Sequence, residues 1–291
     1  MSWQAVAEKD FRDAIRSRLL LALTVLFVLF AGGSAYFAAQ IRPPAQVQFG
    51  GELTTLALIG GLTGPVSVFI PVVAIAAAYR AVAGERQSGS LKLLLSLPNS
   101  REDVVFGKFL GRAGVVSVAL LVGFTVGLFV VATLAEEFSV LEYLVFVFVS
   151  LLLAYVFVSV AVGVSAFTAS TSRAAYGAFG VFVVFQFLWS VLVAGFVYVG
   201  NGFGFPGPDE EFPEWLRTAA EFLTIIDPTA AYQQGVLWVV RRLADQEGQQ
   251  AQAAATDGPF YVQEWFGFVV LLFWVAVPLL VGYWRFQQVD L

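Results

Sequence analysis

Residues Gly84–Lys108 have the sequence GERQSGSLKLLLSLPNSREDVVFGK and lie between two long apolar runs, Leu56–Tyr79 and Phe109–Leu134. The segment is too polar to cross a lipid bilayer, yet its leucines make it too apolar for a free loop. This combination predicts a structured connection between two membrane-spanning helices.

A short helix is predicted inside this segment. After Gly89, the residues Leu91, Leu94 and Leu95 recur with the i, i+3, i+4 spacing of one helix face. Pro98 ends the helix, because proline cannot continue the hydrogen-bond ladder and biases its predecessor away from helical angles.

A second helix is predicted to begin directly afterwards. Ser100 suits an N-cap, and Asp103 at the third helical position approximates a capping box. An amphipathic helix is therefore clamped between two turns and leads into the next apolar run. Two interpretations are open on this pattern alone: the helix lies in the lipid interface, or it docks into a groove on a cytoplasmic partner.

Working outward, the whole chain has the composition of a membrane protein. Of its 291 residues, 59% are hydrophobic and 13% are charged, and the mean hydropathy is +0.80. A helix needs about 20 mostly apolar residues to cross the hydrocarbon core. Six stretches qualify: Leu19–Ala39, Leu56–Tyr79, Phe109–Leu134, Val140–Thr168, Ala174–Val199 and Phe266–Arg285. The predicted fold class is an all-α polytopic membrane protein with six transmembrane helices.

The charges orient these spans. One side of the membrane receives 12 of the 16 Lys and Arg residues, which makes it the cytoplasmic side and places both termini there. The net charge of −5 divides into +5 on this inner side and −10 on the outer side. We expect a multi-pass protein of a prokaryotic plasma membrane. The charged lead-in to the first span is atypical of a cleaved signal peptide and favours a retained helix.

Several chemistries are excluded by what the chain lacks. It has no cysteine and no histidine, which removes Cys/His metal sites, thiol nucleophiles and histidine bases. No ionisable residue lies near the middle of a span, which argues against a proton-coupled transporter or an intramembrane protease. We predict no catalytic residues and no metal site. Arg112, Glu142 and Arg285 lie near span ends, where they can reach the interface.

Two features inside the spans have alternative interpretations. Gln186, near the middle of the fifth span, either makes an interhelical hydrogen bond or lines a translocation path. Gly123 and Gly127 form a small-xxx-small pair, which favours close helix packing inside one subunit over a dimer seam.

A family resemblance rests on the spaced motif inside Gly84–Lys108. Its elements are Gly84-Glu85-Arg86, Gly89, Leu91, Leu94-Leu95, Pro98, Ser100-Arg101 and Lys108. The motif resembles the signature of type-2 ABC-transporter permeases, in particular the subfamily that includes the nitrous-oxide-reductase maturation permease. In that family the motif follows the second of six spans and includes a coupling helix that docks on an ATPase.

The resemblance implies one permease domain over residues 1–291. It comprises an interfacial elbow helix (1–18), a cytoplasmic coupling region (80–108) and an extracytoplasmic segment (200–264). The ATPase-coupling residues it implies are Glu85, Arg86, Gly89, Leu91, Leu94, Leu95, Pro98 and Arg101, with Arg101 and Lys108 anchoring the third span. The second inner turn, before Arg173, is implied as a secondary contact.

The implied function is the permease subunit of an ATP-driven exporter. The chain has no GxxxxGK[ST] loop, so it binds no cofactor itself and is not an enzyme, and ATP and Mg²⁺ belong to the partner ATPase. A second permease subunit and membrane lipids are the other expected partners, and nucleic acid is not. The alternatives are a secondary transporter or channel without an ATPase, and a membrane scaffold for an extracytoplasmic assembly.

The remaining segments carry weaker signals. In Ser2–Arg18, the side chains of Trp3, Ala7, Phe11, Ala14 and Ile15 share one helix face, which we expect to lie in lipid. In the outer segment, a helical pattern surrounds Trp215. Asp227 and Pro228 open a second helix as N-cap and first residue. Gln246–Thr256 is predicted as a loop.

Overall fold

The computed structural model describes residues 3–41, 54–96, 100–204, 213–246 and 263–288. This part of the chain is all-α, apart from one isolated bridge between Thr54 and Glu137. The elements are α1 (Trp3–Ile15), α2 (Arg18–Ile41), α4 (Thr55–Ala78), α5 (Ala83–Ser88), α6 (Ser90–Ser96), α7 (Arg101–Leu134), α8 (Val140–Phe167), α9 (Thr171–Val183), the π-helical turn η1 (Val184–Leu188), α10 (Trp189–Gly200), α11 (Glu214–Ile225), α12 (Pro228–Gln246) and α13 (Phe266–Gln287). Pro98 and all but the first residue of the predicted loop Gln246–Thr256 lie outside the described residues.

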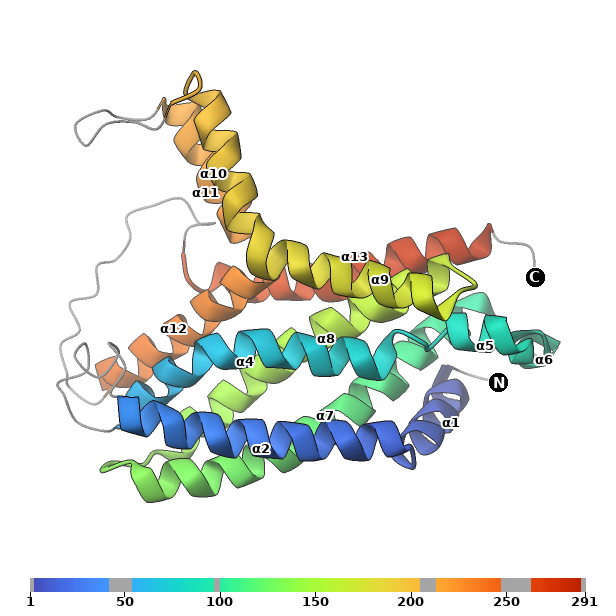
Figure 1. Cartoon of the computed structure of the whole chain (residues 1–291), viewed down its shortest axis with the longest axis horizontal. Helices are drawn as coiled ribbons and strands as arrows, with labels where there is room; N and C mark the ends of the chain where they lie inside the picture. The colour runs from blue at the N-terminus through green and yellow to red at the C-terminus, as the bar shows by residue number, and fades with distance from the viewer. Residues whose placement is uncertain (1–2, 42–53, 97–99, 205–212, 247–262, 289–291) are drawn as a thin grey trace.

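The six predicted spans are confirmed. Among the described residues, six helical segments are long and apolar enough to cross a membrane: those built on α2, α4, α7, α8, α9–η1–α10 and α13. Most of them run along the long axis of one bundle (Figure 1). Both chain ends lie at the same end of the bundle as α1, α5 and α6 (Figure 1).

Helix α8 is the centre of the bundle and packs against α4, α7, α12 and α13. Its closest neighbour is α13: a Cβ atom on Gly163 would overlap the carbonyl oxygen of Pro278, and one on Gly282 would lie 2.7 Å from Gly163 Cα. Ser159 Oγ donates to the Val275 carbonyl (2.7 Å), just before Pro278. This hydrogen bond joins α8 to α13 one turn before the close approach of Gly163 to Pro278.

The start and the middle of α7 agree with the sequence. The predicted capping box is present, with Asp103 N donating to Ser100 Oγ and Ser100 N donating to Asp103 Oδ2, both at 3.0 Å. A Cβ on Gly123 would overlap the ring of Phe27, and one on Gly127 would lie 2.8 Å from the Tyr143 hydroxyl. The small-residue pair therefore packs against α2 and α8 inside one chain, as predicted.

The two helices expected in the outer segment are also confirmed, as α11 and α12. Thr229 N donates to Asp227 Oδ1 (2.9 Å), so Asp227 caps α12, which starts at Pro228. Helix α12 packs against α4, α8 and α13, and its buried Tyr232 hydroxyl pairs with Ser150 Oγ at 3.1 Å.

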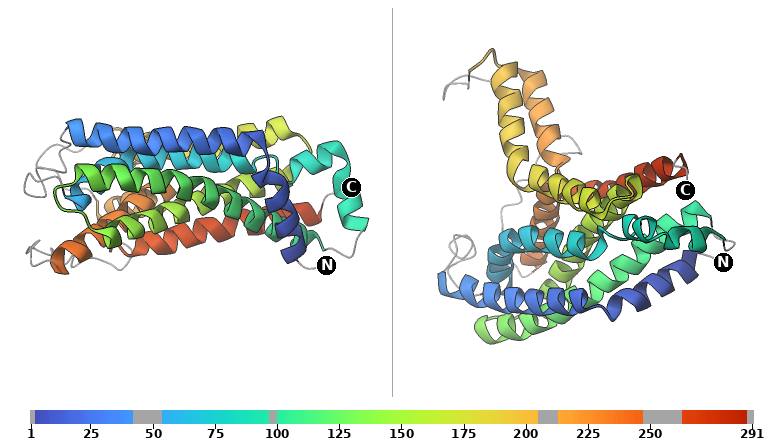
Figure 2. Two further views of the ribbon diagram at one scale, coloured as in Figure 1. Left: turned by 90° about the horizontal axis from the view of Figure 1, so that it is seen from below. Right: turned by 45° about the vertical axis from the view of Figure 1, so that its right-hand side comes forward.

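Glu142 and α1 differ from what the sequence predicts. Glu142 is buried (5% exposed) in the first turn of α8, where the positive end of the helix dipole favours a carboxylate, and does not reach an interface. Helix α1 lies against α7 and crosses the end of the bundle (Figure 2). It buries Val6, Asp10 and Ala14, whereas Trp3 and Ile15 stay exposed. Ala14, expected in lipid, therefore faces protein.

We predict that Gly163→Val destabilises the bundle by about 1–3 kcal/mol or prevents folding, because the new side chain has to displace the α13 backbone. Thermal unfolding of the detergent-purified protein, followed by size-exclusion chromatography, measures the effect. Gly33→Val on α2 is the matched control, since nothing lies within 4 Å of its Cβ position. Equal melting temperatures for the two variants would contradict the α8–α13 contact.

Candidate functional site

The polar segment between α4 and α7 folds into two short helices joined by a sharp corner. Helix α5 ends at Gly89, whose φ of 78° is in the left-handed region, and Gly89 N donates to the Arg86 carbonyl at 3.2 Å. Glycine adopts this conformation without steric cost. Helix α6 starts at the next residue, so Gly89 sets the angle between the two helices.

The corner is fastened to the bundle by polar contacts from two other elements. Ser165 Oγ of α8 accepts hydrogen bonds from Val82 N (3.1 Å) and Ala83 N (2.9 Å), which caps the start of α5. Thr171 Oγ1 at the start of α9 donates to Gln87 Oε1 at 2.8 Å. The two inner turns predicted from the sequence are therefore in direct contact.

The apolar face of α6 points into the chain. Leu91 and Leu94 are 1% and 8% exposed and belong to the main hydrophobic core. The side chain of Leu95 lies outside the described part. The residues left exposed at the turn are polar or small, and we call them the corner surface: Gln87, Ser88, Gly89 and Lys92. A partner reaching this region meets the corner surface, and not the buried leucines.

Beneath the corner lies a buried cluster of opposite charges. Lys108 Nζ on α7 lies 2.8 Å from Glu85 Oε1 on α5 and 3.2 Å from Asp10 Oδ1 on α1. The lysine side chain is 2% exposed and that of Asp10 is 7% exposed. Lys108, implied above as an anchor of the third span, therefore contacts protein and not the lipid interface, because two carboxylates enclose its ammonium. Charges withdrawn from water this far require such partners.

Arg112, one turn further along α7, completes the cluster. Its Nη2 donates to Asp10 Oδ1 (3.1 Å), its Nε lies 2.8 Å from Asp10 Oδ2, and its Nη1 donates to the Ala77 carbonyl near the end of α4 (2.9 Å). The cluster joins α1, α4, α5 and α7, and its two cations balance its two carboxylates. Charge-assisted hydrogen bonds of this kind are about twice as strong as neutral ones.

Glycines on α7 allow the backbones of α7 and α1 to approach closely enough for these ion pairs to form. A Cβ on Gly107 would lie 2.7 Å from the Trp3 carbonyl oxygen, and one on Gly111 would lie 2.9 Å from that of Ala7. Gly114 faces Phe11 in the same way, at 3.1 Å. The sequence interpretation missed this stripe and Asp10. The available signal was the repeated pair Gly107-Lys108 and Gly111-Arg112, one helical turn apart.

Arg101 fastens the start of α7 to the end of α13. Its Nη1 donates to the carbonyls of Phe286 (2.6 Å) and Gln287 (2.8 Å), and its guanidinium lies over the Phe286 ring. A cation there complements the negative end of the α13 dipole. Arg86 is partly buried, and its Nη1 has no hydrogen-bond partner in the described part of the chain.

Gln186 lies in a different part of the molecule. It belongs to η1, which adjoins α12 and whose Phe185 ring lies 4.9 Å from that of Trp274 on α13. The Gln186 Oε1 is buried and has no hydrogen-bond partner among the described residues. Within those residues, no group of three acidic side chains is placed to hold a metal ion.

A family model described as ABC-2 family transporter protein matches residues 4–291. The chain belongs to this family. It is 29% identical over 287 residues to a probable ABC transporter permease protein NosY of Stutzerimonas stutzeri, with 97% of each chain covered. It is 32% identical over 201 residues to the probable NosY permease of Pseudomonas aeruginosa, covering 68% of this chain and 71% of the relative.

Membership of the ABC-2 family decides the coarse function. The chain is an ABC transporter permease, a multi-pass protein of a prokaryotic membrane. Permeases of this kind are not enzymes, and the ATPase is a separate partner subunit. The charge cluster and the corner surface are thus features of a transport subunit.

We predict that Lys108→Met lowers the free energy of unfolding by about 3–5 kcal/mol, because it leaves buried carboxylates with too little positive charge. Thermal or denaturant unfolding in detergent measures the loss. Lys92→Met, at an exposed lysine of α6, is the control and should be neutral. The double variant Lys108→Met/Glu85→Gln should recover part of the loss, since it restores the charge balance. A Lys108→Met protein as stable as the Lys92→Met control would overturn this account of the cluster.

Proposed function

We propose that the chain is the permease subunit of an ATP-driven exporter and that its ATPase partner docks on the corner surface. The observation that carries the proposal is the construction of the α5–α6 corner. Its outer side is exposed and polar, whereas its inner side is fixed by buried leucines and by the charge cluster. A rigid, outward-facing corner suits the transfer of force from a partner.

The contacts under the corner supply the route for that force. Glu85 leads through Lys108 to α7 and through Asp10 to α1. Ser165 connects α5 to α8, and Gln87 connects it to the start of α9. A displacement of α5 by the ATPase therefore acts on most of the bundle at once.

The proposed orientation places the corner in the cytoplasm. The prevailing basic charge of the segments around α1, α5 and α6 supports it, as does the position of both chain ends beside these helices (Figure 1). ATP and Mg²⁺ would bind in the ATPase, on the same side. Export as the direction of transport rests on the resemblance of the motif in Gly84–Lys108 to type-2 permeases.

The translocation path is proposed to run between two permease subunits, with Gln186 on its wall. Gln186 lies in the fifth span, of whose apolar part only 6% is buried within the chain. The π-helical turn around Gln186 supports this role, because such turns frequently occur at functional sites.

The test is co-purification of the permease with a candidate ATPase subunit from the same organism. We predict that Gln87→Glu/Lys92→Glu weakens the association about tenfold or more, because an interface then carries mismatched charge. Lys9→Glu/Arg16→Gln changes the net charge by the same amount at exposed positions of α1 and the turn after it, and should leave the association intact.

ATP hydrolysis by the reconstituted complex provides the second measurement. The corner variant should lose the response of the ATPase to the permease, and the α1 control should keep it. A folded wild-type permease that never associates with the ATPase would sink the proposal. Unchanged association in the corner variant would show that the ATPase docks on another surface of the permease.

A further inference from the structure

The junction between α11 and α12 is held between the fifth and sixth spans. Trp189 Nε1 on α10 donates to the Leu223 carbonyl (2.8 Å), and Trp274 Nε1 on α13 donates to the Ile226 carbonyl (2.7 Å). The ring of Phe185 in η1 lies 4.9 Å from the rings of both tryptophans. Residues that the sequence assigns to an outer segment therefore enter the bundle here.

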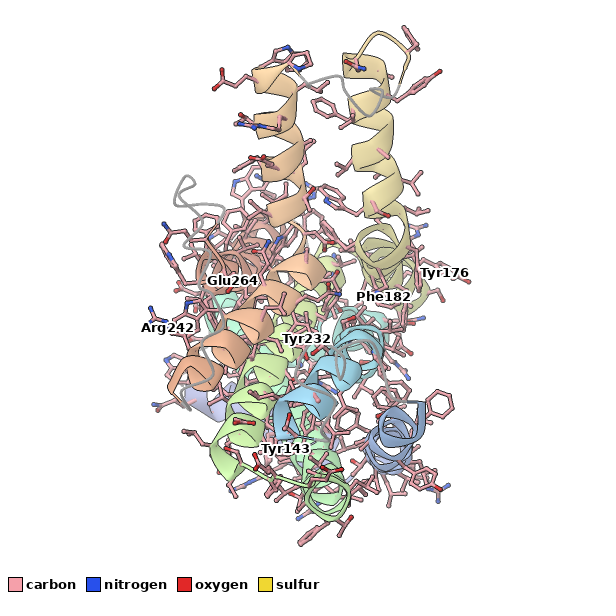
Figure 3. The ribbon with its side chains drawn as sticks, turned by 90° about the vertical axis from the view of Figure 1, so that its left-hand side faces the viewer. Tyr143, Tyr176, Phe182, Tyr232, Arg242 and Glu264 are labelled. Atoms are coloured by element: carbon pink, nitrogen blue, oxygen red, sulfur yellow. The ribbon has the colours of Figure 1, made fainter. Side chains whose placement is uncertain are left out.

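Two contacts place this junction near the middle of the membrane. Trp274 lies about 12 Å along α13 from Phe266, at 1.5 Å per residue. Tyr232, on the second turn of α12, points toward the interior of the bundle (Figure 3) and pairs with Ser150, about 15 Å along α8 from Val140. Both α8 and α13 run toward the end of the bundle that carries the chain termini (Figure 1). Since the hydrocarbon core is about 30 Å thick, the junction is far from both membrane surfaces.

Asp227 is an ionisable residue at this junction. Its side chain is 8% exposed, and its Oδ1 accepts hydrogen bonds from Thr229 N (2.9 Å) and Thr229 Oγ1 (2.8 Å). No Lys or Arg in the described part of the chain forms an ion pair with Asp227. An ionised carboxylate at this depth is costly unless a cation or water satisfies it. Burial raises the pKa of Asp227, and the hydrogen bonds from Thr229 oppose this only in part.

The elements packed against the junction carry few other ionisable residues. Neither α4 nor η1 contains one, and α13 has none before Tyr283. On α11, Arg217 and Glu221 pair with each other. Glu142 of α8 packs beside the middle of α12, roughly two and a half turns from Asp227. The titratable residues nearest to Asp227 are thus Glu221 on α11, Glu142 on α8 and Tyr232 on α12.

A groove between α10, α11 and α12 reaches this junction. Its volume is about 350 Å³, and its polar lining residues are Arg217, Glu221, Thr224 and Gln234. Thr224 is in the last turn of α11, three residues before Asp227. Gln234 Oε1 is buried and has no hydrogen-bond partner among the described residues. The groove has room for several water molecules, which can satisfy this oxygen and carry protons toward Asp227.

We infer that Asp227 is a proton-binding site near the middle of the membrane and that the permease takes up and releases this proton during its transport cycle. The proton forms an O–H bond with Oδ2, because both hydrogen bonds from Thr229 end on Oδ1. It comes from water in the groove and returns to it. A metal ion is a poor alternative, since no group of three acidic residues in the described chain is placed to hold one.

The position of the site connects it to the proposed translocation path. Phe185, which lies against both tryptophans that hold the junction, precedes Gln186 in η1. A change of charge at Asp227 therefore acts beside the wall of that path. This connection to transport rests on the proposed function, whereas proton binding itself does not.

Asp227→Asn separates proton binding from helix capping, because asparagine caps a helix as well as aspartate but cannot ionise. The melting temperatures of the wild-type protein and the variant are measured in detergent from about pH 4, near the ordinary pKa of aspartate, to about pH 8. A raised pKa in the folded protein adds stability at low pH, and this stability is lost as the pH rises. We expect the melting temperature of the wild type, relative to that of Asp227→Asn, to fall by about 3 °C per pH unit.

Asp13→Asn, at an exposed acid of α1, is the matched control, and its difference from the wild type should not change with pH. An ionised helix cap at Asp227 would give the opposite sign, since its stability would be lost as the pH falls. That sign, or a constant difference, overturns the proton site. If Asp227→Asn does not fold, infrared spectroscopy of the wild type decides: a protonated carboxyl band at neutral pH that disappears on raising the pH supports the site, and its absence overturns it.

ATP hydrolysis by the complex reconstituted with the ATPase tests the connection to transport. The part of the rate that depends on the permease should have a pH profile that Asp227→Asn flattens, that Asp227→Glu shifts and that Asp13→Asn leaves unchanged. Equal profiles for the wild type and Asp227→Asn overturn the connection. If the melting temperatures reveal the proton while no ATPase associates, the proposed function fails and the proton site stands. If the ATPase associates while the melting difference stays constant, this inference fails and the proposed function stands.

Discussion

A lysine that water does not reach must be matched by negative charge, and this requirement organises the end of the bundle that carries α5 and α6. The ammonium of Lys108 finds its two carboxylates on other helices, Asp10 and Glu85. Leaving any of these charges alone would cost several kcal/mol, so α1, α5 and α7 are held as one unit. Arg112 extends the unit to α4 through the Ala77 carbonyl. The cluster adds little net stability compared with an apolar core, but it fixes which segments move together.

Such a cluster forms only where backbones come close, and α7 provides this with glycine. Gly107 and Gly111 each precede a cation by one residue, so two successive turns of α7 offer both space and charge to α1. The two faces of the amphipathic helix α6 also have different roles. Leu91 and Leu94 face the core, which leaves a polar corner pointing outward. In the sequence, the apolar face of this helix suggests docking on a partner. In the structure, Leu91 and Leu94 of this face hold the corner in place.

Local patterns in the sequence predicted those structural features that are determined by residues close together in the chain. Hydropathy located the six spans, and short-range chemistry located the capping box at Ser100 and the start of α12 at Asp227. The predictions failed where the deciding partner is remote. Asp10 and Lys108 are 98 residues apart, and nothing in the periodicity of α1 indicates that Asp10, among its three acidic residues, faces protein. For the same reason Glu142 was predicted to reach the interface, whereas α12 packs beside it. The π-helical turn η1 inside the fifth span was also not predicted, because the apolar run of the sequence continues unchanged through η1.

The fifth span connects the corner surface to Gln186. Its first residue, Thr171, bonds to Gln87 on the corner surface, and η1, one α9 length away, contains Gln186. An α-helix transmits displacement along its axis, whereas a π-helical turn is a place where direction changes. If the ATPase docks as proposed, a displacement of the corner acts on the start of α9 through this bond, and η1 marks the point where its direction changes. The proposed docking surface and the proposed path residue Gln186 thus lie near the two ends of one helix, α9.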